Sequence, residues 1–101
     1  VLAVVPFDSE EDAIRIANDS KFGLAAGVWT RDSARGIRMA ERIAAGTVYI
    51  NNYFNATTQS PVGGYKQSGY GRENGIEGMK AFLQTKSVWL ATEPNQPNPF
   101  A

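Results

Sequence analysis

Residues 24–50 read LAAGVWTRDSARGIRMAERIAAGTVYI, and this stretch decides the fold. Its first part, residues 24–30, combines small and β-branched residues, which is typical of a strand that a neighbouring element approaches closely. Asp32 is a predicted N-cap, and the helix after it is expected to end at Gly46 in a left-handed C-cap. Residues 47–50 (TVYI) predict another strand. The apolar face of the helix is predicted to contain Ile37, Ala40, Ile43 and Ala44.

Upstream of this stretch, the pattern predicts a further strand and helix. Residues 1–5 (VLAVV) are a β-branched apolar run that predicts a buried strand, and a cut in a longer chain, if there is one, is expected before it. Ser9 and Asp12 resemble a capping box, which predicts a helix through about Asn18. Its buried stripe is expected to comprise Ala13, Ile14, Ile16 and Ala17. Alternating strands and helices with crossovers of this length predict an α/β fold with an open, mainly parallel sheet and flanking helices.

Downstream, the pattern becomes less regular. Residues 51–71 form a long segment without periodicity, and segments of that length in compact domains are usually functional or mobile. A third helix is predicted from the spacing of Ile76, Met79, Phe82 and Leu83. Residues 87–91 predict a last strand, and residues 93–99, with three of the five prolines, predict an extended or disordered tail.

The composition excludes several classes of chemistry. With no cysteine and no histidine, the chain has no thiolate nucleophile, disulfide, Cys/His zinc site or Ser-His-Asp triad of its own. Ten Lys and Arg residues balance ten Asp and Glu residues without a basic block, so we expect no nucleic-acid partner. No apolar run approaches the roughly 20 residues that span a bilayer, so we expect no membrane partner. The lack of cysteine favours a cytoplasmic location.

Residues 61–75 (PVGGYKQSGYGRENG) stand out for their glycine content, since six of the ten glycines lie between Gly63 and Gly78. Such density indicates tight turns or close backbone approach. The spacing does not match a phosphate-binding P-loop, although an anion-binding loop remains one hypothesis. The other hypothesis is a glycine-rich connection that packs against a neighbouring subunit or domain.

Two further features of this region allow two interpretations each. Glu73, next to Arg72, is either an exposed carboxylate at a helix N-terminus or a proton-relay group. Three aromatic side chains either line a pocket or anchor the loop by packing. These are Tyr53, Phe54 and Tyr65.

Residues 45–82 (AGTVYINNYFNATTQSPVGGYKQSGYGRENGIEGMKAF), preceded by NDSKFGLAAGVWTRD at 18–32, resemble the C-terminal portion of the NAD(P)-dependent aldehyde dehydrogenase superfamily. The resemblance covers residues 1 to about 90, and the wording is closest to betaine aldehyde dehydrogenase-like members. It implies that residues 1–85, with loop 61–75, are the C-terminal part of a catalytic domain. Residues 86–91 would be an oligomerisation strand, and residues 92–101 an extended Pro/Asn tail.

The resemblance implies oxidation of an aldehyde to an acid through a thiohemiacetal, hydride transfer to NAD(P)+ and thioester hydrolysis. In the family, the catalytic cysteine, the general base, the oxyanion-hole asparagine and the NAD(P)-binding domain all lie upstream of the matched region. The chain alone is therefore expected to be inactive and to bind no NAD or NADP. Its implied partners are the missing N-terminal part and further copies, as a dimer or tetramer. A free-standing, non-catalytic assembly module is the alternative.

The family's site residues map onto a few positions. Glu73 matches a proton-relay glutamate of betaine aldehyde dehydrogenase-like members. Lys66 and Gly69 match positions whose backbone carbonyls contribute to an intersubunit potassium site. Residues 87–90 match the strand that pairs across subunits. Phe54, Ala56 and Val62 match positions that line the aldehyde tunnel, although many members have Phe in place of Val62.

Overall fold

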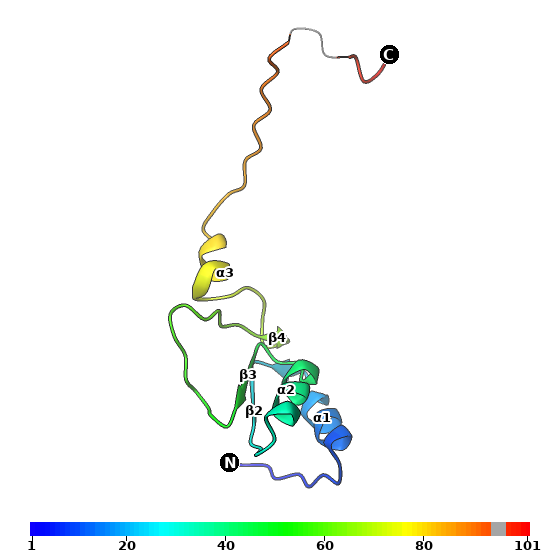
Figure 1. Ribbon diagram of the computed structural model, residues 1–101, viewed down its shortest axis with the longest axis vertical. Coiled ribbons are helices and arrows are strands. Elements are labelled where there is room, and N and C mark those ends of the chain that lie inside the picture. Colours follow the sequence, from blue (N-terminus) through cyan, green and yellow to red (C-terminus); the bar gives the residue numbers. More distant parts are fainter. Residues whose placement is uncertain (94–96) are drawn as a thin grey trace.

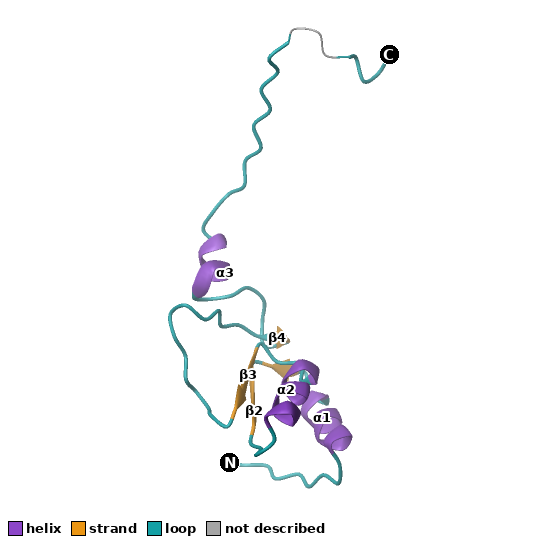
Figure 2. Cartoon of the chain, viewed as in Figure 1, coloured by secondary structure: helices purple, strands orange, loops and turns teal. Residues whose placement is uncertain are grey.

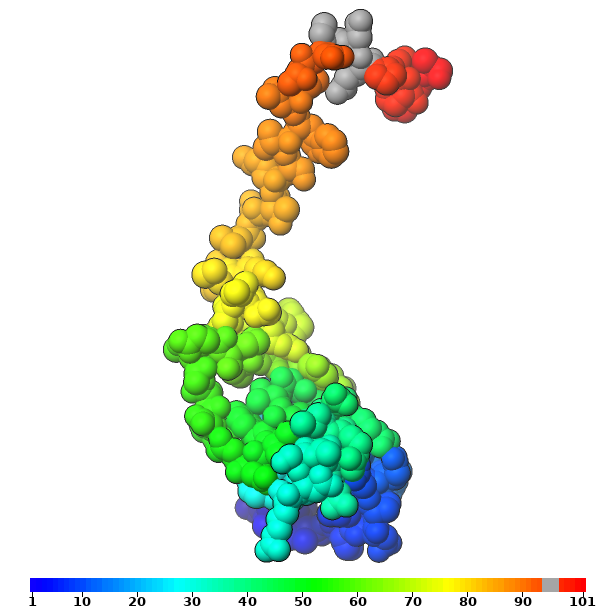
Figure 3. Space-filling view, viewed as in Figure 1, coloured from blue at the N-terminus to red at the C-terminus, as the bar shows by residue number. Residues whose placement is uncertain are grey.

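The computed structural model describes residues 1–93 and 97–101, and it consists of a folded unit with a long C-terminal arm (Figure 1). The radius of gyration is 21.7 Å and the longest dimension is 71 Å. A compact chain of this length has a radius of gyration of about 13 Å, so much of the chain lies outside the packed unit. Figure 3 shows the arm, which follows α3 from residue 81 to residue 93 in the described chain, projecting away from the other elements. The predicted tail at 92–101 includes residues 94–96, which lie outside the described residues.

The centre of the folded unit is a parallel pair of strands, β2 (Ala25–Val28) and β3 (Thr47–Ile50). The register runs from Ala25 opposite Thr47 to Val28 opposite Ile50. The helix α2 (Ser33–Arg42) connects the two strands, as the sequence predicted. In Figure 2, α1 and α2 both lie to the same side of this pair. The small core consists of Val28, Ile43 and Ala45, with Ala26, Met39 and Val48 packed against them.

The two helices begin where the capping residues predicted. The helix α1 (Glu10–Asn18) starts after Ser9, whose hydroxyl accepts a hydrogen bond from the backbone N–H of Asp12 at 3.1 Å. The Asp32 carboxylate caps α2 in the same way, accepting from the backbone N–H of Arg35 at 3.1 Å. Each cap satisfies a backbone donor that the first helical turn leaves free.

The end of α2 differs from the prediction. The helix ends at Arg42, and Gly46 does not have a positive φ. Gly46 is needed for close approach instead, because a Cβ at this position would collide with the carbonyl of Gly63. The apolar face is as predicted at Ile43, which is buried, and at Ala40 and Ala44, which are half-buried. It differs in that Ile37 is exposed and Gly36 is buried. Gly36 lets α2 approach the Ile50 side chain of β3.

A second, short sheet was not predicted. It pairs β1 (Phe22–Gly23) with β4 (Tyr65–Lys66) in the antiparallel sense, with Phe22 opposite Lys66 and Gly23 opposite Tyr65. Both strands have two residues, which is too short for a periodic pattern to show. This sheet attaches the glycine-rich loop to the folded unit.

Three predicted elements are shorter or lie outside regular structure. Residues 1–5 form no strand and their apolar side chains are exposed, because the described residues offer this segment no partner strand. The third helix, α3 (Gly75–Lys80), ends before Phe82 and Leu83, which are exposed. Residues 87–91 also form no strand in the described chain, so their pairing across subunits stays a prediction. In the part of the chain described, no helix has the length and apolar character to cross a membrane.

Candidate functional site

The loop after β3 leaves the parallel sheet at Asn51, at the carboxyl end of the strands. Asn51 has a left-handed φ of 53°, and its side-chain amide exchanges two hydrogen bonds with the main chain of Thr30. Thr30 N–H donates to Oδ1 and Asn51 Nδ2 donates to the Thr30 carbonyl, both at 2.8 Å. The backbone N–H of Asn51 also donates to the Val28 carbonyl at 2.8 Å. Asn51 thus extends the ladder by one step and turns the chain away at the edge where open α/β sheets bind ligands.

Aromatic side chains follow this turn. The Tyr53 ring lies between those of Trp29 and Phe54, with centroid separations of 6.3 and 6.5 Å. Tyr49 meets Tyr53 edge to face at 5.3 Å. Phe54 is at one end of this row, with a φ of 63° and 86% of its surface exposed. Phe54 is therefore presented by the loop and not buried by it.

Val62 and Glu73 form the neck of the glycine-rich loop. Val62 N–H donates to the Glu73 carbonyl at 2.8 Å, and Glu73 N–H donates to the Val62 carbonyl at 2.7 Å. The Glu73 side chain is exposed and Val62 is half-buried. Two residues later, Gly75 N–H donates to the Thr58 carbonyl at 3.0 Å, which ties this loop to residues 51–60.

The interior of the loop is filled by its own atoms. Arg72 Nη1 donates to the carbonyls of Gly64 at 3.1 Å and Gly71 at 2.6 Å, and its guanidinium lies 5.6 Å from the centre of the Tyr65 ring. A Cβ at Gly63 would meet the Arg72 side chain at 2.7 Å. Gly63 is therefore needed for packing within the loop. Because the Arg72 side chain occupies the space beside Gly63, this glycine does not offer the open backbone that a pyrophosphate needs.

Lys66 and Asn18 connect the loop to both helices. Lys66 Nζ donates to the backbone carbonyls of Asn18 at 2.8 Å and Ser20 at 3.1 Å, at the C-terminal end of α1. The Asn18 side chain in turn donates to the Arg42 carbonyl at 2.9 Å and accepts from the Ala44 N–H at 2.7 Å. The ends of α1 and α2 and the loop thus share one hydrogen-bond network.

Two acidic residues in the first turn of α1, Glu10 and Glu11, form ion pairs with arginines of α2. Hydrogen bonding to Arg38 lowers the pKa of Glu10, which also pairs with Arg35. Hydrogen bonding to Arg42 likewise lowers the pKa of Glu11. These ion pairs join α1 to α2, and none of the three involves a residue of the glycine-rich loop.

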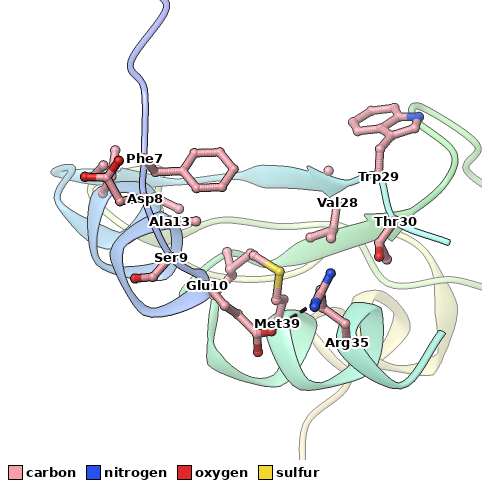
Figure 4. Close-up of a pocket in the computed structure, with 14 residues that line it drawn as sticks. Phe7, Asp8, Ser9, Glu10, Ala13, Val28, Trp29, Thr30, Arg35 and Met39 are labelled. Carbon is pink, nitrogen blue, oxygen red and sulfur yellow. Dashed lines mark hydrogen bonds and ion pairs between the residues drawn. The ribbon is translucent and has the colours of Figure 1, made fainter. Parts of the chain in front are cut away.

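A cavity of about 660 Å³ lies elsewhere in the fold. It is open on one side, between the chain entering α1, the end of β2 and the face of α2 (Figure 4). Phe7, Val28 and Met39 contribute apolar walls, and Glu10 and Arg35 form an ion pair within the same group of residues. None of Phe54, Ala56, Val62 and Glu73 lines it. This cavity therefore carries no part of the predicted chemistry.

The structure brings some of the predicted residues together and separates others. Val62 and Glu73 are directly paired, and Lys66 and Gly69 lie in one short turn, whereas Phe54 lies in the aromatic row and Ala56 is exposed. Described residues contain no group of three or more His, Cys, Asp or Glu side chains suited to a metal. The sequence reasoning missed the side chains of Asn18, Asn51 and Lys66 as structural links. Of these three, only Asn51 had a local sequence signal: it directly follows the β-branched strand at 47–50, and Asn tolerates the left-handed region that a turn there requires.

Known proteins with a related sequence were found for most of the chain. The aldehyde dehydrogenase family profile matches residues 1–88. The NADP/NAD-dependent aldehyde dehydrogenase PuuC of Escherichia coli K12 is 47% identical over 92% of this chain and 19% of its own length. A betaine aldehyde dehydrogenase of Brucella anthropi is 50% identical over 89% of this chain and 18% of its own length. The chain thus spans about a fifth of the length of these relatives.

Solved structures match the fold equally well. The betaine aldehyde dehydrogenase of Staphylococcus aureus, in complex with NAD+, superposes with a TM-score of 0.88 at 43% identity, over 94% of this chain and 19% of that one. The NAD+ complex of a Bacillus cereus aldehyde dehydrogenase gives a TM-score of 0.89 at 47% identity, over 92% of this chain and 19% of that one. By sequence and by structure, the chain belongs to the aldehyde dehydrogenase family.

Proposed function

We propose that this chain forms the C-terminal part of the catalytic domain of an NAD(P)-dependent aldehyde dehydrogenase that oxidises a betaine aldehyde-like substrate to the acid. One observation carries the proposal. The chain matches NAD+-bound aldehyde dehydrogenases closely over nearly its whole length, yet its apolar ends are uncovered. Trp89 is 94% exposed and Leu2 is 87% exposed, so further protein surface is needed to bury them.

The chemistry is then divided between this segment and the remainder of the enzyme. The nucleophile must come from outside these residues, because they include no cysteine. NAD(P)+ would be held by residues outside this segment, where it would supply the hydride acceptor. This segment contributes Phe54, Ala56 and Val62 to the aldehyde tunnel, since loops 51–60 and 61–75 are tied together at Thr58 and Gly75.

Glu73 and the turn at Lys66 have separate proposed roles. The backbone of Glu73 pairs with that of the half-buried Val62, and the Glu73 carboxylate is exposed, so it can move a proton between the tunnel and water. Lys66 and Gly69 can offer backbone carbonyls to a potassium ion, which takes oxygen ligands, but two carbonyls do not complete its shell. A second subunit would supply the rest.

The exposed terminal segment supports assembly into a dimer or tetramer. Val88, Trp89 and Leu90 are each more than four-fifths exposed and follow the helix α3 without regular pairing. An unpaired extended segment of this kind can add to the sheet edge of another copy. A free-standing assembly module would use the same segment without any catalysis.

Activity of the complete gene product separates these alternatives. The product that contains these residues is purified and supplied with NAD+ or NADP+ together with betaine aldehyde or a simple aliphatic aldehyde. We expect NAD(P)H formation, fastest with betaine aldehyde, and none from residues 1–101 alone. If the natural gene product begins near Val1 and forms no NAD(P)H, the chain is instead the assembly module.

A further inference from the structure

Lys66 has a backbone conformation that its side chain does not favour. Its φ is 53°; at the other positive-φ positions of the same loop stand three glycines, at 69, 71 and 75, and Asn74, a residue type that tolerates this region. This region is sterically unfavourable for a non-glycine residue, so the presence of Lys66 calls for a compensating interaction. The compensating interaction is visible, since the Lys66 ammonium binds two carbonyls at the end of α1.

The position of these carbonyls makes the contact directional. The C-terminal end of a helix carries partial negative charge, which attracts a cation within its last turn. Lys66 Nζ reaches Asn18 O at 2.8 Å and Ser20 O at 3.1 Å, across a sequence separation of more than 40 residues. Next to it, Gln67 N–H donates to the Lys21 carbonyl at 2.9 Å and Gly23 N–H donates to Ser68 Oγ at 3.0 Å. One side of the loop is therefore fixed to α1 and β1.

The other side of the loop carries the residues assigned to the substrate. From Lys66 the chain returns to the Val62–Glu73 neck within seven residues, and Arg72 braces the interior against Gly64. Displacement of Lys66 would therefore be passed to the neck through a loop whose interior is already filled. We infer that Lys66 is a positioning residue, whose ammonium is anchored on the carbonyl of Asn18, the last residue of α1, and on that of Ser20 just after it. This anchor sets where the glycine-rich loop presents Val62 and Glu73 to the aldehyde. This inference rests on the proposed function.

Substitutions at this one position separate the ammonium from the backbone. Lys66→Met keeps the aliphatic stem but loses the charge. Lys66→Gly removes the side chain and relieves the left-handed backbone. Lys66→Arg keeps a cation, and Lys80→Met in α3 is the matched control, because it removes an exposed lysine outside the loop.

Two readouts are measured on the complete gene product. We expect Lys66→Met and Lys66→Gly to raise KM for the aldehyde roughly tenfold, because small misplacements of substrate-contacting groups are costly. KM for NAD(P)+ should stay within about twofold, since the loop does not bind the dinucleotide. Hydrogen exchange should accelerate at the amides of Gln67, Val62 and Glu73 and not in β3. Lys66→Arg and Lys80→Met should resemble the wild type in both readouts.

The contrary results are equally specific. If Lys66→Gly keeps the wild-type aldehyde KM and exchange rates, the backbone conformation alone places the loop and the inference is wrong. A lower melting temperature with unchanged KM in Lys66→Met would also overturn it, because it would show a purely structural contact. If the wild-type product oxidises no aldehyde, the proposed function fails, while the exchange rates still decide whether Lys66 places the loop.

Discussion

Val62 and Glu73 donate backbone hydrogen bonds to each other, at 2.8 and 2.7 Å, and thereby close the neck of the glycine-rich loop. Both bonds use main-chain atoms, so the pair fixes where the two side chains start without engaging either of them. The backbone pairing thus places Val62, the proposed tunnel residue, directly opposite Glu73, the proposed proton-relay residue. Their side chains can be changed without breaking the neck.

Glu73→Gln is expected to lower kcat of the complete enzyme by at least about tenfold, since a relay carboxylate assists proton transfer. The melting temperature should not change, because the backbone pair with Val62 is retained. Steady-state rates across pH, with Glu77→Gln in α3 as the control, make the test. An unchanged kcat in Glu73→Gln would leave this residue as an exposed carboxylate only.

Asn51→Ala should lower the free energy of unfolding by about 1–2 kcal/mol, because both side-chain hydrogen bonds to Thr30 are lost. Asn51→Asp loses the Nδ2 donor alone and should be destabilised in the same direction. Urea unfolding of these variants is compared with Asn55→Ala, in the same loop, for which we expect a change within about 0.5 kcal/mol. Equal stability of Asn51→Ala and the wild type would show that the amide pair with Thr30 is not formed.

Gly46→Ala should be more damaging than its small size suggests. The added methyl group would collide with the Gly63 carbonyl, and a backbone atom cannot yield as a flexible side chain does. We expect a loss of about 3 kcal/mol or more. Gly71→Ala is the control, because it has open space around it and a φ of 83°, so only about 1 kcal/mol of backbone strain is expected. Similar midpoints of urea unfolding for the two variants would contradict the close approach.

Stability should fall in acid through the pairs between α1 and α2. The fold lowers the pKa values of Glu10 and Glu11, so their contribution is present above the ordinary glutamate value of 4.5 and is lost as the pH falls below it. Glu10→Gln should flatten the acid limb of a melting-temperature profile more than Glu11→Gln, because Glu10 meets two arginines and is less exposed. High salt should reduce the difference in acid sensitivity between the Glu10→Gln and Glu11→Gln variants, because it screens exposed ion pairs. If the melting temperatures of Glu10→Gln and the wild type fall in parallel as the pH is lowered, the ion pairs of Glu10 with Arg35 and Arg38 do not contribute to stability.

The sequence was sufficient to predict the parts of the fold that have local signals. Ser9 and Asp32 mark the starts of α1 and α2, and the parallel pairing of β2 with β3 follows from the strand–helix–strand order. What escaped prediction depends on distant partners. The β1–β4 sheet joins two-residue strands far apart in sequence, and the Lys66 anchor spans from the loop to α1.

Predictions at the two ends failed or stayed open for another physical reason. Residues 1–5 and 87–91 have β-branched and aromatic residues that favour strands, but a strand forms only where a neighbour supplies hydrogen bonds. The described residues supply none there. In the candidate site, Glu73 was singled out by its place beside Arg72 and Val62 through the family resemblance, whereas their direct pairing is a tertiary contact that no spacing reveals.

The most direct test of the proposed enzyme is product stoichiometry. The complete gene product is incubated with betaine aldehyde and NAD(P)+, and NAD(P)H and the carboxylic acid are both quantified over time. If these residues belong to an aldehyde dehydrogenase that acts on such a substrate, one acid is formed for each NAD(P)H. If neither product is formed from betaine aldehyde or from aliphatic aldehydes, the account of this chain as the tunnel-forming part of an active enzyme is wrong.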